Sequence, residues 1–133
     1  LRVEVDYSFP SIKVVDIVNQ VIECRGKPED IRSDNGTEFI AKAFMGFCKN
    51  SGINHVRIQK GKPNQNAYVE RFNRTYREDV LDANIFEKIN QVRELTDDWV
   101  YDYNENHPHA SLGNMSPNKF LISKQEKMSI FTL

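Results

Sequence analysis

The sequence lacks any apolar run that approaches the roughly 20 residues needed to cross a bilayer, so no membrane span is expected. Its first six residues include two acids and no apolar stretch, and we expect no secretory signal peptide. The chain has no initiator Met, which predicts that it begins partway through a longer protein. Together these absences predict a cytoplasmic protein without a membrane partner.

Cysteine is scarce as well. Cys24 and Cys48 are the only two, and they form no Cys-x-x-Cys pair. Each falls within an apolar helical pattern, which is typical of buried free thiols in a reducing compartment and disfavours a disulfide. The three histidines, His55, His107 and His109, stand at no metal-ligand spacing from either cysteine, so we expect no zinc site.

The chain also lacks an excess of either charge: 18 basic and 19 acidic residues give a formal net charge of −1. This balance argues against a uniformly basic nucleic-acid binder. The charges are unevenly distributed, however. Residues 58–77 hold five basic side chains and one acid, Glu70, whereas residues 78–105 hold nine acids and two basic side chains. The sequence therefore predicts a basic patch beside an acidic helix.

Strand and helix patterns alternate along the chain, as is typical of a parallel sheet flanked by helices. Ser11 is expected to cap the first helix, and Gly26 to end it; Thr37 is expected to cap the second helix, which ends near Gly52. In chain order we predict a strand over 2–7, a helix over 11–25, a strand over 31–34, a helix over 37–52, a strand over 53–58, a loop over 60–66, and helices over 66–81 and 86–104.

Two carboxylates stand out against this order of elements. Asp34 comes at the carboxyl end of a strand, where open α/β sheets place their ligand sites, and Glu70 comes near the start of a helix. Carboxylates delivered by rigid elements can hold the pair of Mg²⁺ ions that serves phosphodiester cleavage. Taken singly, Asp34 in Asp-Asn-Gly is typical of a turn residue and Glu70 of a solvated helix residue.

The 35 residues between Asp34 and Glu70, with their flanking segments, resemble the catalytic core of retroviral-type integrases and bacterial insertion-sequence transposases. The resemblance covers nearly the whole chain, and its motifs occur in order. They are Gly26-Lys27-Pro28, Asp34-Asn35-Gly36, Gly61-Lys62-Pro63-Asn64-Gln65-Asn66-Ala67, Glu70-Arg71-Phe72-Asn73-Arg74 and Tyr103-Asn104-Glu105-Asn106-His107-Pro108-His109. The last motif reads as a helix cap and turn without a chemical role.

The resemblance implies an α/β, ribonuclease H-like mixed sheet flanked by helices, with a core over residues 1–121 and a C-terminal tail over 122–133. It implies that Asp34 and Glu70 are catalytic ligands of Mg²⁺, for which Mn²⁺ can substitute. The implied reaction is DNA strand cleavage followed by 3′-hydroxyl strand transfer. The implied partners are transposon ends, target DNA and further copies of the chain, in a nucleoid-associated bacterial protein.

The family also has a first catalytic Asp, on the first strand of the sheet. Asp6, Asp16 and Asp30 precede Asp34, and none has the strands and helix that must follow that position. We therefore expect Asp6 to lie on the third strand, the chain to be truncated at its N-terminus, and this chain to be inactive alone. A catalytically dead DNA-binding or self-associating remnant, and a hydrolytic nuclease of the same fold, remain alternatives.

The polar face of the helix that carries Glu70 is expected to meet DNA phosphates, with two lysines on the preceding loop. The predicted DNA-binding residues are Lys60, Lys62, Asn66, Asn73, Arg74 and Arg77. The alternative is a salt-bridged surface in which Glu70 pairs with Arg74. Glu38, one turn after Asp34, is either an auxiliary acid or a surface residue.

Overall fold

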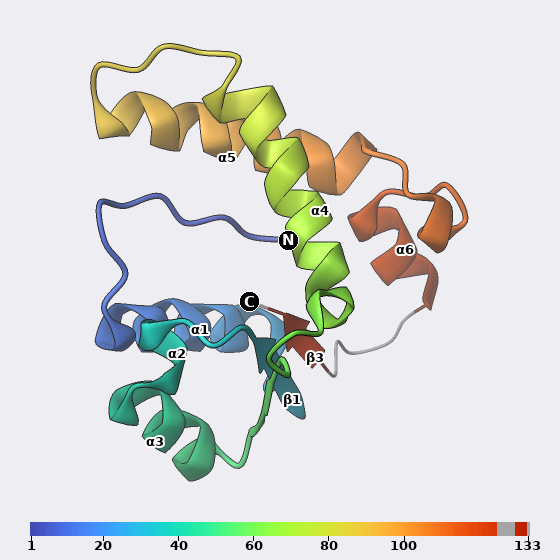
Figure 1. Ribbon diagram of the computed structural model, residues 1–133. Coiled ribbons are helices and arrows are strands. Elements are labelled where there is room, and N and C mark those ends of the chain that lie inside the picture. Colours follow the sequence, from blue (N-terminus) through green and yellow to red (C-terminus); the bar gives the residue numbers. More distant parts are fainter. Residues whose placement is uncertain (125–129, 133) are drawn as a thin grey trace. The chain divides into compact units, whose positions relative to one another are not determined.

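The computed structural model of the chain describes residues 1–124 and 130–132 (Figure 1). The chain divides into two compact units. We call Ser8–Phe72 with Lys127–Leu133 the sheet unit, and Leu1–Tyr7 with Asn73–Glu126 the helical unit.

The sheet unit alternates helices with short parallel strands. Its elements are α1 (Ser11–Arg25), β1 (Asp30–Ser33), α2 (Thr37–Ile40), α3 (Lys42–Ser51), β2 (Asn54–Arg57), the 3₁₀ turn η1 (Pro63–Asn66), the start of α4 (Ala67–Tyr76) and β3 (Ile130–Thr132). The strand order is β2-β1-β3, and Asp30 is in register with both Asn54 and Ile130. Both ladders are parallel, as the alternation predicts. No antiparallel pair occurs in the described sheet, so its mixed character stays a prediction.

The core of the sheet unit lies where α1 and α3 pack against β1. It consists of Val14, Val18, Ile31, Phe44, Cys48 and Ile53. Phe44 is fully buried and meets Phe39 edge to face, with 5.5 Å between ring centroids. Burial raises the pKa of the Cys48 thiol. Cys24 is exposed, contrary to prediction, because it lies off the face of α1 that carries Val14 and Val18.

The helix predicted from Thr37 to Gly52 is broken in two. Ala41 adopts an extended conformation, with φ −66° and ψ 149°, between α2 and α3. The hydroxyl of Ser11 accepts the N–H of Phe44 at 3.1 Å, which satisfies a free donor in the first turn of α3. The prediction that Ser11 caps its own helix is wrong: α1 follows Pro10, which makes no side-chain cap hydrogen bond. Thr37 is the first residue of α2 rather than its cap.

The helical unit contains the end of α4 and its continuation in a π-helical turn, η2 (Arg77–Leu81), followed by α5 (Ile89–Asn106), the 3₁₀ turn η3 (Ala110–Leu112) and α6 (Pro117–Lys124). The helices predicted over 66–81 and 86–104 are therefore confirmed. Val80 of η2 and Thr96 of α5 are buried in the unit where these two elements pack together, and Tyr103 is buried further along α5 against Trp99, His107 and His109.

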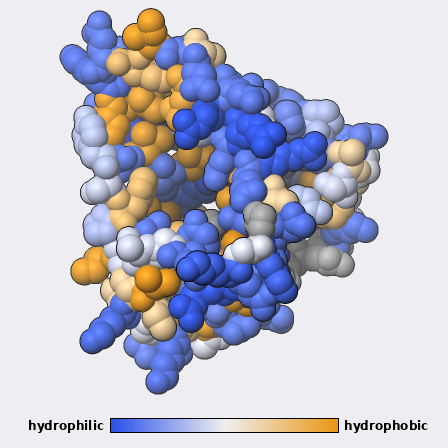
Figure 2. Space-filling model, viewed as in Figure 1, coloured by the Kyte–Doolittle hydropathy of each residue, from blue (hydrophilic) through white to orange (hydrophobic). Residues whose placement is uncertain are grey.

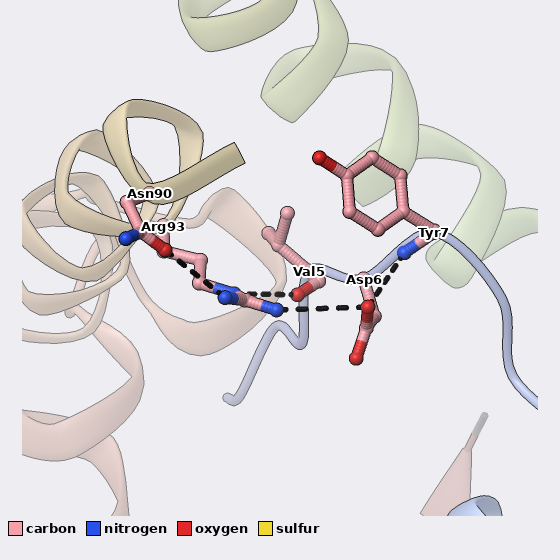
Figure 3. A network of polar contacts seen from close by, with 5 residues as sticks. All are labelled: Val5, Asp6, Tyr7, Asn90 and Arg93. Carbon is pink, nitrogen blue, oxygen red and sulfur yellow. Dashed lines mark hydrogen bonds and ion pairs between the residues drawn. The ribbon is translucent and has the colours of Figure 1, made fainter. Parts of the chain in front are cut away.

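Residues 2–7 form no strand in the structure, and this prediction is wrong. Side chains of α5 hold the segment instead (Figure 3). The Leu1 ammonium donates to the side-chain oxygen of Asn104 at 2.7 Å, and the Asn104 side-chain nitrogen donates to the Leu1 carbonyl at 2.8 Å. The Arg93 guanidinium donates to the Val5 carbonyl at 3.1 Å and lies 3.6 Å from the Asp6 carboxylate. Asp6 therefore does not lie on a strand beside β1. The alternating valines are consistent with either environment, which is why the pattern alone misleads.

The helical unit also exposes apolar side chains. Figure 2 shows hydrophobic residues gathered at the upper left, over the N-terminal segment and the loop that precedes α5. Tyr7 is 85% exposed and Ile85 is 99% exposed. Among the described helices, none combines the length and the apolar character that a membrane span needs.

Candidate metal centre and nucleic-acid surface

Asp34 lies directly after β1, in the turn that leads to α2. Its Oδ1 accepts the N–H of Gly36 at 2.8 Å, as in an Asx turn. The side chain is exposed, and its second oxygen makes no hydrogen bond within the described residues. One oxygen therefore fixes the orientation of the carboxylate while the other is available to a ligand.

The turn that carries Asp34 is tied to the end of β2. The N–H of Ile58 donates to the Ser33 carbonyl at 3.0 Å, and the Asn35 side chain donates to the Ile58 carbonyl at 2.8 Å. Both neighbours of Asp34 are thus bound to one residue of the adjacent chain segment. This arrangement holds the candidate ligand on a rigid element, as a metal site requires.

Sequence reasoning missed two side chains behind this turn. The buried Ser33 hydroxyl lies 2.9 Å from the Asp34 carbonyl oxygen and 2.7 Å from Nε2 of His55 on β2. Burial, and secondarily the charge of Arg57, lower the pKa of His55. The available signal was that Ser33 and Ile31 alternate as inward-facing residues of β1, and that His55 is in register with Ile31.

Glu38 approaches the same turn. A Cβ placed on Gly36 would lie 2.8 Å from Oε1 of Glu38 and 3.0 Å from Oδ1 of Asp34. The two carboxylates therefore flank one point, which only a residue without a side chain leaves open. This position is consistent with an auxiliary acid, and the role of Glu38 stays a prediction.

Glu70 lies in the first turn of α4 and is exposed. In the part of the chain that the structure describes, it makes no hydrogen bond or ion pair, so the alternative pairing with Arg74 is not formed. Glu70 belongs to the sheet unit, as Asp34 does. No group of three or more metal-ligating side chains occurs among the described residues. If both residues hold one hydrated Mg²⁺, we expect their carboxylates to lie about 4–8 Å apart before the metal binds, and this separation stays a prediction.

Two of the predicted DNA-binding residues lie on the loop that follows β2. Lys60 and Lys62 are both exposed. The loop is closed by a hydrogen bond of 2.9 Å from the N–H of Gln59 to the side chain of Gln65. Arg32, which was not predicted, lines a hollow of about 250 Å³ together with these two glutamines. The structure thus presents cationic side chains on the segment between β2 and α4.

The other predicted DNA-binding residues follow on η1, α4 and η2. Asn66 ends η1, and its buried Oδ1 has no hydrogen-bond partner among the described residues. Asn73, Arg74 and Arg77 are exposed but belong to the helical unit. The structure therefore groups Lys60, Lys62 and Asn66 with the carboxylates in one unit, and DNA contact stays a prediction for all six residues.

Comparisons with known proteins identify related sequences. A family model described as integrase core domain matches residues 51–117, and a second model of the same description matches residues 10–63. The insertion element IS476 39.2 kDa protein of Xanthomonas euvesicatoria is 37% identical over 118 residues, which cover 89% of this chain and 34% of that protein. The insertion element IS407 31.7 kDa protein of Burkholderia multivorans is 34% identical over 116 residues, which cover 87% of this chain and 42% of that protein. The chain thus spans less than half the length of these relatives.

Solved structures share the fold. A simian T-cell lymphotropic virus intasome in complex with PP2A regulatory subunit B56 gamma gives a TM-score of 0.67 at 17% identity, over 86% of this chain and 41% of that chain. The BIV integrase catalytic core gives 0.62 at 20% identity, over 92% and 77%. The HTLV-2 integrase catalytic core in complex with magnesium, in a trimeric form, gives 0.54 at 19% identity, over 84% and 69%. These likenesses confirm the predicted α/β, ribonuclease H-like fold.

Proposed function

Because the chain belongs to the integrase core domain family, we propose that it is part of the catalytic domain of a DNA transposase of an insertion sequence. The observation that carries the proposal is the placement of Asp34 and Glu70. One lies at a strand end held by hydrogen bonds, the other in the first turn of a helix of the same unit, and both are exposed. The proposed reaction is DNA strand cleavage followed by joining to a 3′-hydroxyl end.

The side chains present fit a hard divalent cation in chemistry, since Mg²⁺ prefers carboxylate oxygens. Asp34 has an oxygen without a hydrogen bond among the described residues, and Glu70 is unpaired there. These two residues would hold Mg²⁺, or Mn²⁺ in its place. When bound, the metal supplies activation of the attacking hydroxyl and stabilisation of the leaving oxygen.

The basic and amide side chains would bind the DNA substrate. Lys60 and Lys62 would contact phosphates from the loop, and Asn66, Asn73, Arg74 and Arg77 from η1, α4 and η2. Such contacts supply affinity and salt dependence rather than sequence choice. We propose transposon ends and target DNA as the substrates.

A joining assay tests the proposed function. The full-length protein encoded by the reading frame that contains this chain is incubated with a labelled terminal-repeat oligonucleotide, target DNA and Mg²⁺. Asp34→Asn and Glu70→Gln should each abolish joining, because each removes a charged metal ligand. Asp16→Asn and Glu23→Gln are matched controls, since both acids are exposed on α1. Cleavage without joining would identify a nuclease instead.

One observation favours a second candidate, a non-catalytic DNA-binding module. Lys60 and Lys62 are exposed, and lysines can bind DNA phosphates without any metal ion. The same assay decides between the two candidates. DNA binding that persists without joining, and that is indifferent to Asp34→Asn and Glu70→Gln, would support the module.

We also propose that the chain self-associates, because the helical unit exposes apolar residues such as Leu1, Tyr7 and Ile85. Light scattering at rising protein concentration tests this. A stable monomer at high concentration would contradict it.

A further inference from the structure

The side chains of Ser33 and His55 form a hydrogen-bonded chain that ends on the main chain of Asp34. Ser33 is the last residue of β1 and is 0% exposed. Its Oγ lies 2.9 Å from the carbonyl oxygen of Asp34 and 2.7 Å from Nε2 of His55. A buried hydroxyl with two partners at such distances has its hydrogen-bonding need satisfied.

The protons in these two hydrogen bonds can be assigned by counting donors. A carbonyl oxygen only accepts hydrogen bonds, so the single hydroxyl proton of Ser33 must point to Asp34. The bond between Ser33 and His55 then needs a proton from the imidazole. Nε2 of His55 therefore carries hydrogen and donates to Ser33, which donates in turn to Asp34.

His55, the first donor of this series of hydrogen bonds, packs against the core of the sheet unit. The His55 ring meets Phe44 edge to face, with 5.1 Å between centroids and an interplanar angle of 77°. Phe44 is itself fully buried, so the imidazole rests on a side chain that cannot move aside without opening the core. Burial and the nearby Arg57 lower the pKa of His55, which favours the neutral ring with one N–H.

We propose that Ser33 and His55 are positioning residues for Asp34, and that their hydrogen bonds set the direction in which its carboxylate faces a metal ion. The inference rests on the proposed function, in which Asp34 is a metal ligand. Three bonds then fix Asp34: Ser33 holds its carbonyl, Gly36 holds Oδ1 at 2.8 Å, and Ile58 holds the preceding carbonyl at 3.0 Å. Groups hydrogen-bonded behind a ligand orient it and tune metal affinity.

Nitrogen-15 NMR of the 133-residue chain tests the hydrogen-bond assignment without DNA or metal. The expected spectrum shows neutral His55 with its proton on Nε2. In Ser33→Ala this preference should weaken, because the acceptor for that proton is gone. A wild-type His55 protonated on Nδ1 alone would overturn the assignment, and the positioning proposal with it.

A DNA-joining assay with the full-length protein tests the consequence for Asp34. Ser33→Ala breaks the chain, His55→Phe keeps a ring against Phe44 but donates no hydrogen bond, and His55→Gln restores an N–H donor. In Ser33→Ala and His55→Phe we expect kcat to fall and the Mn²⁺ concentration for half-maximal joining to rise, each by about ten- to hundredfold, with KM for DNA unchanged. His55→Gln should remain near wild type.

Thermal unfolding of each variant separates positioning from general loss of structure. Wild-type joining and metal dependence in His55→Phe would overturn the proposal, as would equal losses in His55→Gln and His55→Phe. If Asp34→Asn joins DNA normally, the proposed function fails and so does the role toward metal. An Nε2-protonated His55 in that case would show that the error lies in the function and not in the hydrogen-bond chain.

Discussion

The sheet unit and the helical unit bury different kinds of side chain. In the sheet unit, α1 and α3 close an apolar core over β1, with Val18, Ile31 and Phe44 almost completely inaccessible. The helical unit buries Val80 and Tyr103 together with polar Thr96, Asn104 and Ser116. One unit therefore depends mainly on apolar burial, and the other on hydrogen bonds and aromatic contacts.

The aromatic contacts of the helical unit form a ladder. Tyr76 meets Trp99 at 5.4 Å between centroids, Trp99 meets Tyr103 at 4.9 Å, and Tyr103 stacks on His107 at 4.6 Å with an angle of 11°. Trp99 also donates to Asp79 at 3.0 Å. The difference teaches that the candidate metal ligands lie in the unit whose rigidity comes from close packing, which suits a site that needs fixed geometry.

The largest effect is expected in the core of the sheet unit. Phe44→Ala should destabilise it by about 3–5 kcal/mol, because it removes a buried aromatic ring and leaves a cavity. Hydrogen exchange of the β1 and β2 amides measures the loss. Met45→Ala, next to it on α3 and 45% exposed, is the control and should change exchange little.

The next effect breaks a polar contact of the helical unit. Tyr76→Phe removes the partner of the Thr96 hydroxyl, which lies 2.7 Å from the Tyr76 oxygen and is buried. An unpaired buried hydroxyl should cost about 1–3 kcal/mol. Urea unfolding followed by Trp99 fluorescence measures it. Tyr101→Phe, at a 70% exposed position of α5, the helix that carries Thr96, should unfold like wild type.

A smaller effect is expected on DNA binding, where removal of charge in the sheet unit and in the helical unit should have different results. Lys60→Ala with Lys62→Ala should weaken DNA binding at low salt and reduce the salt slope, by about 0.9 for each phosphate that the variant no longer neutralises. The matched control is Asp97→Asn with Asp98→Asn, at two exposed acids of α5. This double variant should leave the salt slope of DNA binding intact or strengthen the binding. Fluorescence anisotropy across a salt series is the measurement. An unchanged slope in the lysine variant would place the DNA elsewhere.

The smallest effect is a pH dependence confined to the sheet unit. The pKa of His55 is lowered on folding, so the unfolded chain binds its proton more readily than the folded chain does. The contribution of this group to stability is present above the ordinary histidine pKa of about 6.5 and is lost as pH falls through the lowered folded value. Urea midpoints at successive pH values should show this decline. His55→Gln should reduce it, whereas an identical pH profile would contradict the shift.

Much of the local structure can be read from the sequence, because it depends on near neighbours. Gly26 and Gly52 end α1 and α3 with positive φ, as their positions after apolar helical patterns predict. The strand before Asp34 and the helix that carries Glu70 are found within a few residues of their predicted bounds. The separation of Asp34 and Glu70, together with the flanking motifs in their order, indicates the family.

Three features depend on partners distant in the chain, and the sequence pattern does not reveal them. Ser11 caps α3 and not α1, because folding brings its hydroxyl to Phe44, 33 positions away. Residues 2–7 dock on side chains of α5 instead of joining the sheet. Ile130–Thr132 pairs with β1, although the tail carries little pattern.

The sequence by itself determined the alternation of elements, the two exposed carboxylates and the basic segment between them, since residue type and spacing fix these locally. Only the tertiary structure decided how Asp34 is held. Its supports are Ser33 of β1, His55 of β2 and Ile58 just after β2. The parallel pairing of the two strands brings these residues, more than 20 positions apart, within hydrogen-bonding distance. Hydrogen bonds require contact in space, and contact between distant segments exists only once the sheet and its core have formed.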